Sequence, residues 1–141
     1  MHGFPGRWLW RGALAVSVLG LLLVGDEAKA LKLMPLQIEE SSGAFEVSNN
    51  SKRFVRVQVH VYPARKLDNG RTTADLTPLP AETVQRLIRL RPSSFRLGAN
   101  ARRIVNYKVL DASTNSEFFV CAETMAAIGK IRICSRWQPS S

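Results

Sequence analysis

The feature that most constrains the fold is a strict alternation of apolar and polar residues between Arg53 and Tyr62. Valines occupy every second position of this stretch, at 55, 57, 59 and 61, and the polar residues between them are Arg56, Gln58 and His60. Successive side chains of a strand point to opposite faces, so a period of two predicts a half-buried β-strand. We expect the valines to enter a core and the polar residues to face solvent.

The same alternation recurs along the rest of the chain. It is found in Val84 to Leu90, Phe95 with Leu97, Val105 to Val109, Phe118 with Val120, and Ile131 with Ile133. Residues 31–39 are also expected to be extended, with Pro35 marking an edge strand or a switch point. About seven short strands without intervening helices predict an all-β, immunoglobulin-like β-sandwich.

Three local expectations follow from the residues between these strands. Asn49-Asn50-Ser51 predicts a tight hairpin turn that pairs residues 44–48 with the valine strand. Residues 66–80, rich in Asp, Asn, Gly, Thr and Pro, predict a surface loop. Residues 81–90 fit either a short helix or a strand, and strand is preferred because the segment is short and runs into Pro92.

The amino-terminal thirty residues have the organisation of a secretory signal peptide. Arg7 and Arg11 precede an apolar run at 13–24, which is followed by Ala28-Lys29-Ala30. The run is shorter than the roughly 20 residues that cross a bilayer as a helix, although an uncleaved anchor is the alternative interpretation. We expect cleavage before Leu31, a folded domain over 31–137, a short tail over 138–141, no remaining membrane span, and a periplasmic or secreted location.

The chain is basic, with 20 Lys and Arg against 11 Asp and Glu and a net charge of +9. Residues 1–30 carry three basic and two acidic residues, so the expected mature chain keeps +8. An exported protein does not ordinarily meet chromosomal nucleic acid, so the surplus favours a carboxylate, an acidic protein or an anionic envelope surface as the partner. The alternative is that the arginines between 86 and 103 solvate an outer face and discourage edge-to-edge aggregation.

Cys121 and Cys134 are the two cysteines of the chain. Export favours a disulfide between them, worth ~3 kcal/mol by chain entropy, and two buried free thiols are the alternative. A zinc site with three or four His or Cys ligands would need almost all of the two cysteines and two histidines of the chain, so we expect no metal and no cofactor. Nucleophile elbows, paired metal-binding histidines and phosphate-binding glycine loops are missing from the sequence, so we expect no catalytic residues and no enzyme.

Several motifs together resemble a known family. They are Leu36-x-Ile38, Phe45-Glu46-Val47-Ser48-Asn49-Asn50, Val55-Arg56-Val57-Gln58-Val59, Ile88-x-Leu90-x-Pro92 and Phe95-Arg96-Leu97. The pattern is similar to the amino-terminal domain of PapD-like periplasmic pilus chaperones. The resemblance implies an immunoglobulin-like domain that lends its last strand to an incomplete pilin. Such strand addition uses main-chain hydrogen bonds for affinity and alternate apolar side chains to fill a groove.

The resemblance also implies candidate binding residues. The family's Ile-Lys-Leu near the end of the last strand is matched by Ile131-Arg132-Ile133, within a strand expected at 129–136. Arg132 is therefore the candidate anchor for a subunit's terminal carboxylate, an exposed strand arginine being the alternative, and Met125 is the main apolar residue of the segment before the strand. The family's first-strand Thr-Arg corresponds to Leu36-Gln37, and a separate chain would have to replace the family's second domain.

The sequence thus supports two hypotheses of function. The first is a periplasmic chaperone-like protein that binds pilus or envelope subunits through an edge strand and basic residues. The second is a structural or adhesive immunoglobulin-like module that stays within a surface assembly. A chaperone leaves its client, whereas a structural module remains in the purified fibre.

Overall fold

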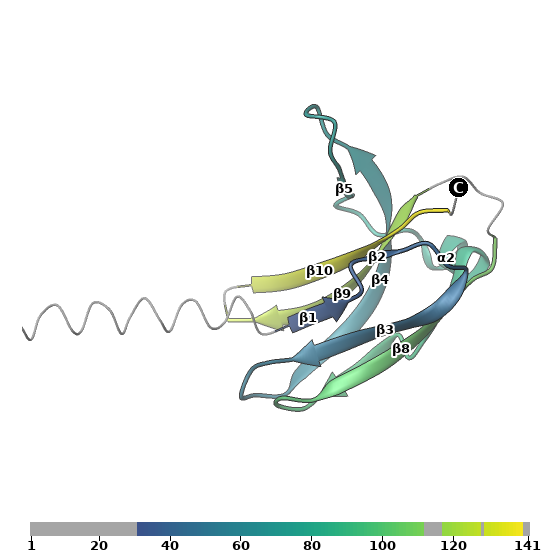
Figure 1. Ribbon diagram of the computed structural model, residues 1–141. Coiled ribbons are helices and arrows are strands. Elements are labelled where there is room, and N and C mark those ends of the chain that lie inside the picture. Colours follow the sequence, from purple (N-terminus) through teal and green to yellow (C-terminus); the bar gives the residue numbers. More distant parts are fainter. Residues whose placement is uncertain (1–30, 112–116, 128, 140–141) are drawn as a thin grey trace, which may run out of the picture.

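The computed structural model describes residues 31–111, 117–127 and 129–139, and the signal peptide predicted over 1–30 lies outside these residues. The described chain forms two facing sheets (Figure 1). The four-stranded sheet has the order β1 (Leu31–Met34), β3 (Ser42–Asn49), β8 (Arg102–Val109) and β6 (Ile88–Arg91). The six-stranded sheet has the order β2 (Gln37–Ile38), β10 (Gly129–Trp137), β9 (Phe118–Ala126), β4 (Val55–Lys66) and β5 (Thr72–Ala74), with β7 (Ser94–Leu97) also paired to β4. The all-β, immunoglobulin-like sandwich predicted from the sequence is confirmed.

The core lies between the two sheets and is built by alternation. Val57, Val59 and Val61 of β4 are buried, whereas Arg56 and Gln58 are exposed, as predicted. The same inward pattern is seen in β8, where Val105, Tyr107 and Val109 are buried. Leu97 is buried as well, and the half-buried Phe95 packs on the core. β9 departs from simple alternation, because residues 118–124 are buried on both faces.

Two prolines mark points at which the chain passes from one sheet to the other. Pro35 separates β1, which pairs with β3, from β2, which runs parallel to β10, so the switch point predicted there is confirmed. Pro92 separates β6 from β7 in the same way. Proline removes a backbone donor and so interrupts a ladder. The described residues form ten strands, because residues 31–39 form two strands and β5 is added to the expected ones.

The hairpin predicted at Asn49-Asn50-Ser51 is wrong. β3 pairs with β1 and β8, whereas β4 pairs with β5, β7 and β9, so this connection crosses from one sheet to the other. The side chain of Asn49 is fully buried, and its amide nitrogen donates to the carbonyl oxygens of Arg53, Leu97 and Gly98 at 2.7, 3.1 and 2.9 Å. The asparagine therefore links the connection before β4 to the end of β7 by hydrogen bonds. Its φ is not positive, whereas a tight hairpin turn requires a positive φ.

Two further local predictions need correction. The strand preferred for residues 84–90 is confined to β6, because the helix α2 spans Ala81–Leu87. Pro80 begins this helix and Val84 N–H donates to its carbonyl, so the less favoured interpretation is right for most of the segment. Residues 66–80 are not simply a loop. β4 continues to Lys66 and pairs with β5, which makes a hairpin that projects from the body of the sandwich (Figure 1).

Candidate functional site

The site suggested by the resemblance lies on β10, which has one open edge. β9 pairs with β10 over its whole length, from Gly129 to Trp137. On the other side, β2 reaches only Arg136 and Trp137, and no described strand pairs with residues 129–135, which we call the open edge of β10. Arg136 N–H and Gln138 N–H donate toward β2. By strand alternation, the backbone groups of Lys130, Arg132 and Cys134 face the open edge.

The disulfide fixes this strand to its neighbour. Cys121 and Cys134 are bonded and stand directly opposite each other in β9 and β10, with their Cα atoms 4.0 Å apart. Such closeness is typical of a non-hydrogen-bonded antiparallel pair, in which side chains approach most closely. The predicted disulfide is therefore present, and it holds the open edge on a covalently closed hairpin.

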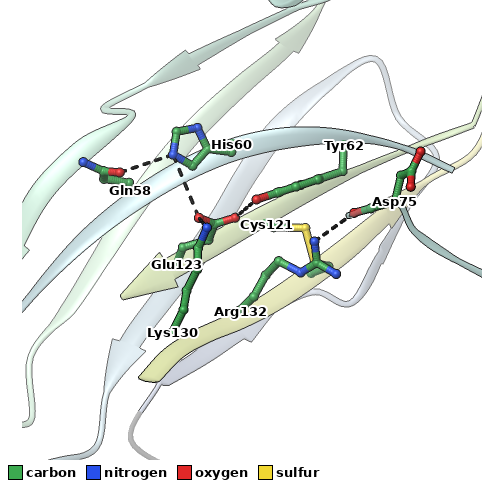
Figure 2. A network of polar contacts seen from close by, with 9 residues as sticks. Gln58, His60, Tyr62, Asp75, Cys121, Glu123, Lys130 and Arg132 are labelled. Carbon is green, nitrogen blue, oxygen red and sulfur yellow. Dashed lines mark hydrogen bonds and ion pairs between the residues drawn. A yellow bond between two sulfur atoms is a disulfide. The ribbon is translucent and has the colours of Figure 1, made fainter. Parts of the chain in front are cut away.

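A polar network covers the outer face of the same hairpin (Figure 2). The carboxylate of Glu123 is buried and accepts a hydrogen bond from the hydroxyl of Tyr62. Lys130 Nζ lies 2.8 Å from Glu123 Oε2, and His60 Nε2 lies 4.0 Å from the same oxygen. Gln58 Oε1 is 3.3 Å from His60 Nε2. The network thus ties together β4, β9 and β10.

These contacts shift the protonation equilibria of the network. Burial by itself raises the pKa of the Glu123 carboxyl, but hydrogen bonds from Lys130 and Tyr62 outweigh that effect, so the net pKa lies below its ordinary value. The hydrogen bond to Glu123 raises the pKa of Lys130. Burial, together with the hydrogen bond to Glu123, raises the pKa of Tyr62. At neutral pH the network therefore holds an ionised carboxylate, an ammonium group and a neutral phenol.

Arg132, the candidate anchor, is half-buried and engaged with its own domain. Its guanidinium carbon lies 4.6 Å from the centre of the Tyr62 ring, and its Nη1 donates to the carbonyl oxygen of Asp75 at 2.9 Å. Asp75 follows β5, so the arginine also tethers the projecting hairpin to β10 (Figure 2). The side chain is neither free in solvent nor directed at an empty site.

The remaining predicted binding residues lie on opposite faces. Ile131 and Ile133 are half-buried and pack on the core between the sheets. Met125 is 73% exposed and stands opposite Lys130 at the tip of the β9–β10 hairpin. Strand alternation puts Met125 on the outer face with Arg132. The structure therefore brings Met125 and Arg132 to one face and the two isoleucines to the other.

Sequence reasoning missed a second basic residue of β10. Gln37, which corresponds to the arginine of the family's first strand, lies directly opposite Arg136 in the β2–β10 register. Arg136 Nη2 is 2.6 Å from Glu117 Oε2, and Gln138 donates to Glu117 Oε1 at 3.0 Å. These donors lower the pKa of Glu117, with the bond from Gln138 contributing most. Arg136 and Gln138 together thus hold a carboxylate that directly precedes β9, the strand paired with β10.

No group of three metal-ligating side chains is found among the described residues. A hollow of about 590 Å³ lies between α2 and β4, and the ionisable residues lining it are His60 and Arg89. Within the same residues, no helix has the length and hydropathy to span a membrane.

Comparison with known proteins identifies structures but no sequence relatives. No family model and no curated protein matches the sequence. Among solved structures, the chain is similar to the E. coli chaperone DraB, with 14% identity and a TM-score of 0.54 over 77% of this chain and 54% of that one. The chain is also similar to the structure of the Salmonella enterica SafA pilin in complex with the SafB chaperone. The sequence identity is 18% and the TM-score is 0.52, over 79% of this chain and 55% of that one.

The Pseudomonas aeruginosa CupB2 chaperone is a third neighbour, with 19% identity and a TM-score of 0.53 over 77% of this chain and 55% of that one. The chain thus spans about half the length of the chaperones it matches. At these identities the likeness concerns the fold, and it agrees with the motifs recognised in the sequence. The described part of the chain has the fold of a PapD-like chaperone domain.

Proposed function

We propose that this protein is a non-enzymatic, chaperone-like protein that binds pilus or envelope subunits in the periplasm or outside the cell. The open edge of β10 carries the proposal, because it lies in a fold shared with the DraB chaperone and with the SafB chaperone, whose structure was solved in complex with the SafA pilin. The alternative of a permanent structural module has no such support among these neighbours.

Binding would proceed by addition of a client strand to the open edge. The backbone groups of Lys130, Arg132 and Cys134 would pair with the client's main chain, which gives affinity independent of the client's sequence. Ile131 and Ile133 would supply apolar contacts, since both are half-buried beside that edge. The disulfide and the Glu123 network would hold the strand rigid, so that little conformational entropy is lost on binding.

A carboxylate of the client would be held at one of two arginines. Arg132 is the residue implied by the resemblance, and Met125 shares its face. Arg136 is the stronger candidate on geometry, because Arg136 and Gln138 already hold the carboxylate of Glu117. A client carboxylate would take the place of Glu117, and an arginine suits this exchange because it donates two parallel charge-assisted hydrogen bonds.

The experiment is affinity purification of the tagged full chain from the cell envelope of its own organism, followed by mass spectrometry at moderate salt. The proposal expects one subunit at equal stoichiometry that is also present in mature fibres, whereas the tagged chain is absent from them. Recovery of the tagged chain only within purified fibres would instead identify a structural module. Recovery of the chain alone would contradict subunit binding.

Paired variants separate edge pairing from carboxylate binding. Arg132→Ala removes the side chain only, whereas Arg132→Pro also removes the N–H that faces the open edge. If strand addition operates, Arg132→Pro abolishes capture and Arg132→Ala retains more of it. Arg136→Ala tests the second arginine, with capture reduced on the order of tenfold for loss of a charge-assisted hydrogen bond. Thermal melts of each variant show whether the fold is retained, and equal capture by Arg132→Pro and Arg132→Ala would exclude edge pairing.

A further inference from the structure

The outer face of the four-stranded sheet carries an unusual arrangement of basic residues. The side chains that alternate away from the core on β1, β8 and β6 include five exposed cations, which we call the basic face: Lys32, Arg89, Arg91, Arg102 and Lys108. Arg89 stands directly opposite Lys108 in the β6–β8 register, and Arg91 follows on the same side of β6. Like charges placed opposite each other on a sheet are destabilising.

Few acidic side chains compensate the five cations of the basic face. Glu46 of β3 is the acidic residue within it, and its carboxylate lies 3.7 Å from Arg102 Nη1. Both side chains of this pair are well exposed, at 41% and 72%, so the contact is weak. The other nearby acids, Glu39, Glu40 and Asp111, lie at one margin, in the segments before β3 and after β8. The face therefore retains a net positive charge.

Apolar side chains stand among these cations. Ile104 and Met34 lie on either side of Glu46 in the cross-strand register, and they are 49% and 46% exposed. From the spacing of strands and residues, the face measures about 15 by 20 Å. Lys32 of β1 pairs with the end of β3 that faces Arg102. Arg89 of β6 pairs with Lys108, which lies near the other end of β8. The five cations are thus spread over a plane of this size and are not gathered at one point.

We propose that the basic face docks this domain on an anionic lipid surface. A planar array of cations matches the charge of a bilayer rich in anionic headgroups, each Lys or Arg near such a surface contributing to the attraction. The exposed Ile104 and Met34 enter the headgroup region, as apolar residues do in proteins that lie at the interface. This surface lies on the sheet opposite to β10, so lipid docking leaves the open edge of β10 free.

The test is co-sedimentation of the full protein, as recovered from the expressing cell, with vesicles of phosphatidylglycerol and phosphatidylcholine at low and moderate salt. Vesicles of phosphatidylcholine alone measure any binding that does not depend on anionic lipid, including binding by residues 1–30. Arg89→Gln/Lys108→Gln removes two charges from the basic face. Arg56→Gln/Arg65→Gln removes two charges from exposed positions on β4 and is the matched control.

The proposal expects salt-sensitive binding to the anionic vesicles, weakened on the order of tenfold in the Arg89/Lys108 variant and little changed in the Arg56/Arg65 variant. Ile104→Ser should weaken it further. Equal losses in the two double variants would overturn the proposal, because net charge and not this face would then drive binding. Absence of binding to anionic vesicles would also overturn it, as would the same variant-dependent binding to poly-glutamate alone, which would identify an acidic protein as the partner.

Discussion

The outer faces of the two sheets handle charge in opposite ways. On the six-stranded sheet, Glu123 binds Lys130 and Tyr62, and Glu117 binds Arg136, so the acids and bases neutralise each other within the domain. Even Arg96, which lies opposite Arg56, rests on the ring of Phe54 at 4.4 Å. On the four-stranded sheet, Arg89 and Lys108 also face each other across the ladder, and Glu46 is the acid that lies among the five cations of the basic face. The acids of the first face are therefore held by partners within the domain, whereas the second face carries more cations than acids and can offer them to an external partner.

The difference also concerns rigidity. The outer face of the six-stranded sheet, which we call the paired face, includes the disulfide, the buried carboxylate of Glu123 and the contact of Arg132 with the Tyr62 ring. All three lie at the β9–β10 hairpin that carries the open edge of β10. On the basic face, opposite charges meet in the exposed Glu46–Arg102 pair. Substitutions on the paired face should therefore destabilise the fold, whereas neutralising charges on the basic face should not.

The largest expected effect is that of the disulfide. Replacing both Cys121 and Cys134 by Ala should lower the free energy of unfolding by about 3 kcal/mol, because the unfolded chain regains the entropy of the loop that the bond closes. Chemical denaturation of the wild type with and without reductant measures the same quantity independently. Intact mass after alkylation reports the redox state, and two alkylated thiols in the native, air-exposed protein would contradict this prediction.

Glu123→Gln should cost about 2 kcal/mol at pH 7, because it removes the ion pair with Lys130 while a buried polar group remains. The lowered pKa of Glu123 gives the sign of the pH dependence. Its stabilisation is complete above the ordinary glutamate pKa of about 4.3 and is lost as the pH falls through the lowered value. Denaturation curves between pH 7 and pH 2 should show the wild type approaching the variant in acid, and a constant difference would rule out this role.

Arg132→Ala should cost about 1 kcal/mol, since the guanidinium loses its contact with the Tyr62 ring and its hydrogen bond to Asp75. Arg132→Lys keeps the charge but not the planar group, and it should recover only part of the loss. Urea denaturation of both variants measures the difference. Full stability in Arg132→Ala would mean that the side chain is held without energetic benefit and is free for a partner.

The smallest effect should have the opposite sign. Arg89→Gln, which leaves Lys108 without a facing cation, should stabilise the domain by a few tenths of a kcal/mol. The gain should shrink at 0.5 M salt, where repulsion between exposed charges is screened. Denaturation at low and high salt provides the comparison, and destabilisation by Arg89→Gln would show that the two faces do not differ as described.

Local pattern was enough for much of the fold. Alternating valines in β4 and the Val105–Val109 repeat in β8 predict strand faces that the structure reproduces, because burial on one face imposes a period of two. Pro35 marks the point at which the chain leaves one sheet for the other, since proline cannot continue the ladder. The turn at Asn49 was mispredicted because its amide binds carbonyls 48 and 49 residues away, which no local pattern contains.

The candidate site was only partly foreseeable. Ile131, Arg132 and Ile133 could be selected from the sequence, and the disulfide could be expected from export and the number of cysteines. Arg136 could not, because its hold on Glu117, 19 positions earlier in the chain, and its place opposite Gln37 exist only once β10 pairs with β9 and β2. The buried Glu123 likewise carries no local signal, since its partners come from β4 and β10.

The sequence by itself determined the class of fold, the extended segments and their inward faces, because these depend on neighbours two residues apart. The tertiary structure alone decided which strands share a sheet, which edge of β10 stays open, and which charges meet partners. Those outcomes depend on contacts between residues far apart in the chain. The basic surplus is evident from the sequence, but only the sheet register shows that Lys130 and Arg136 meet carboxylates on one face and that Arg89 meets Lys108 on the other.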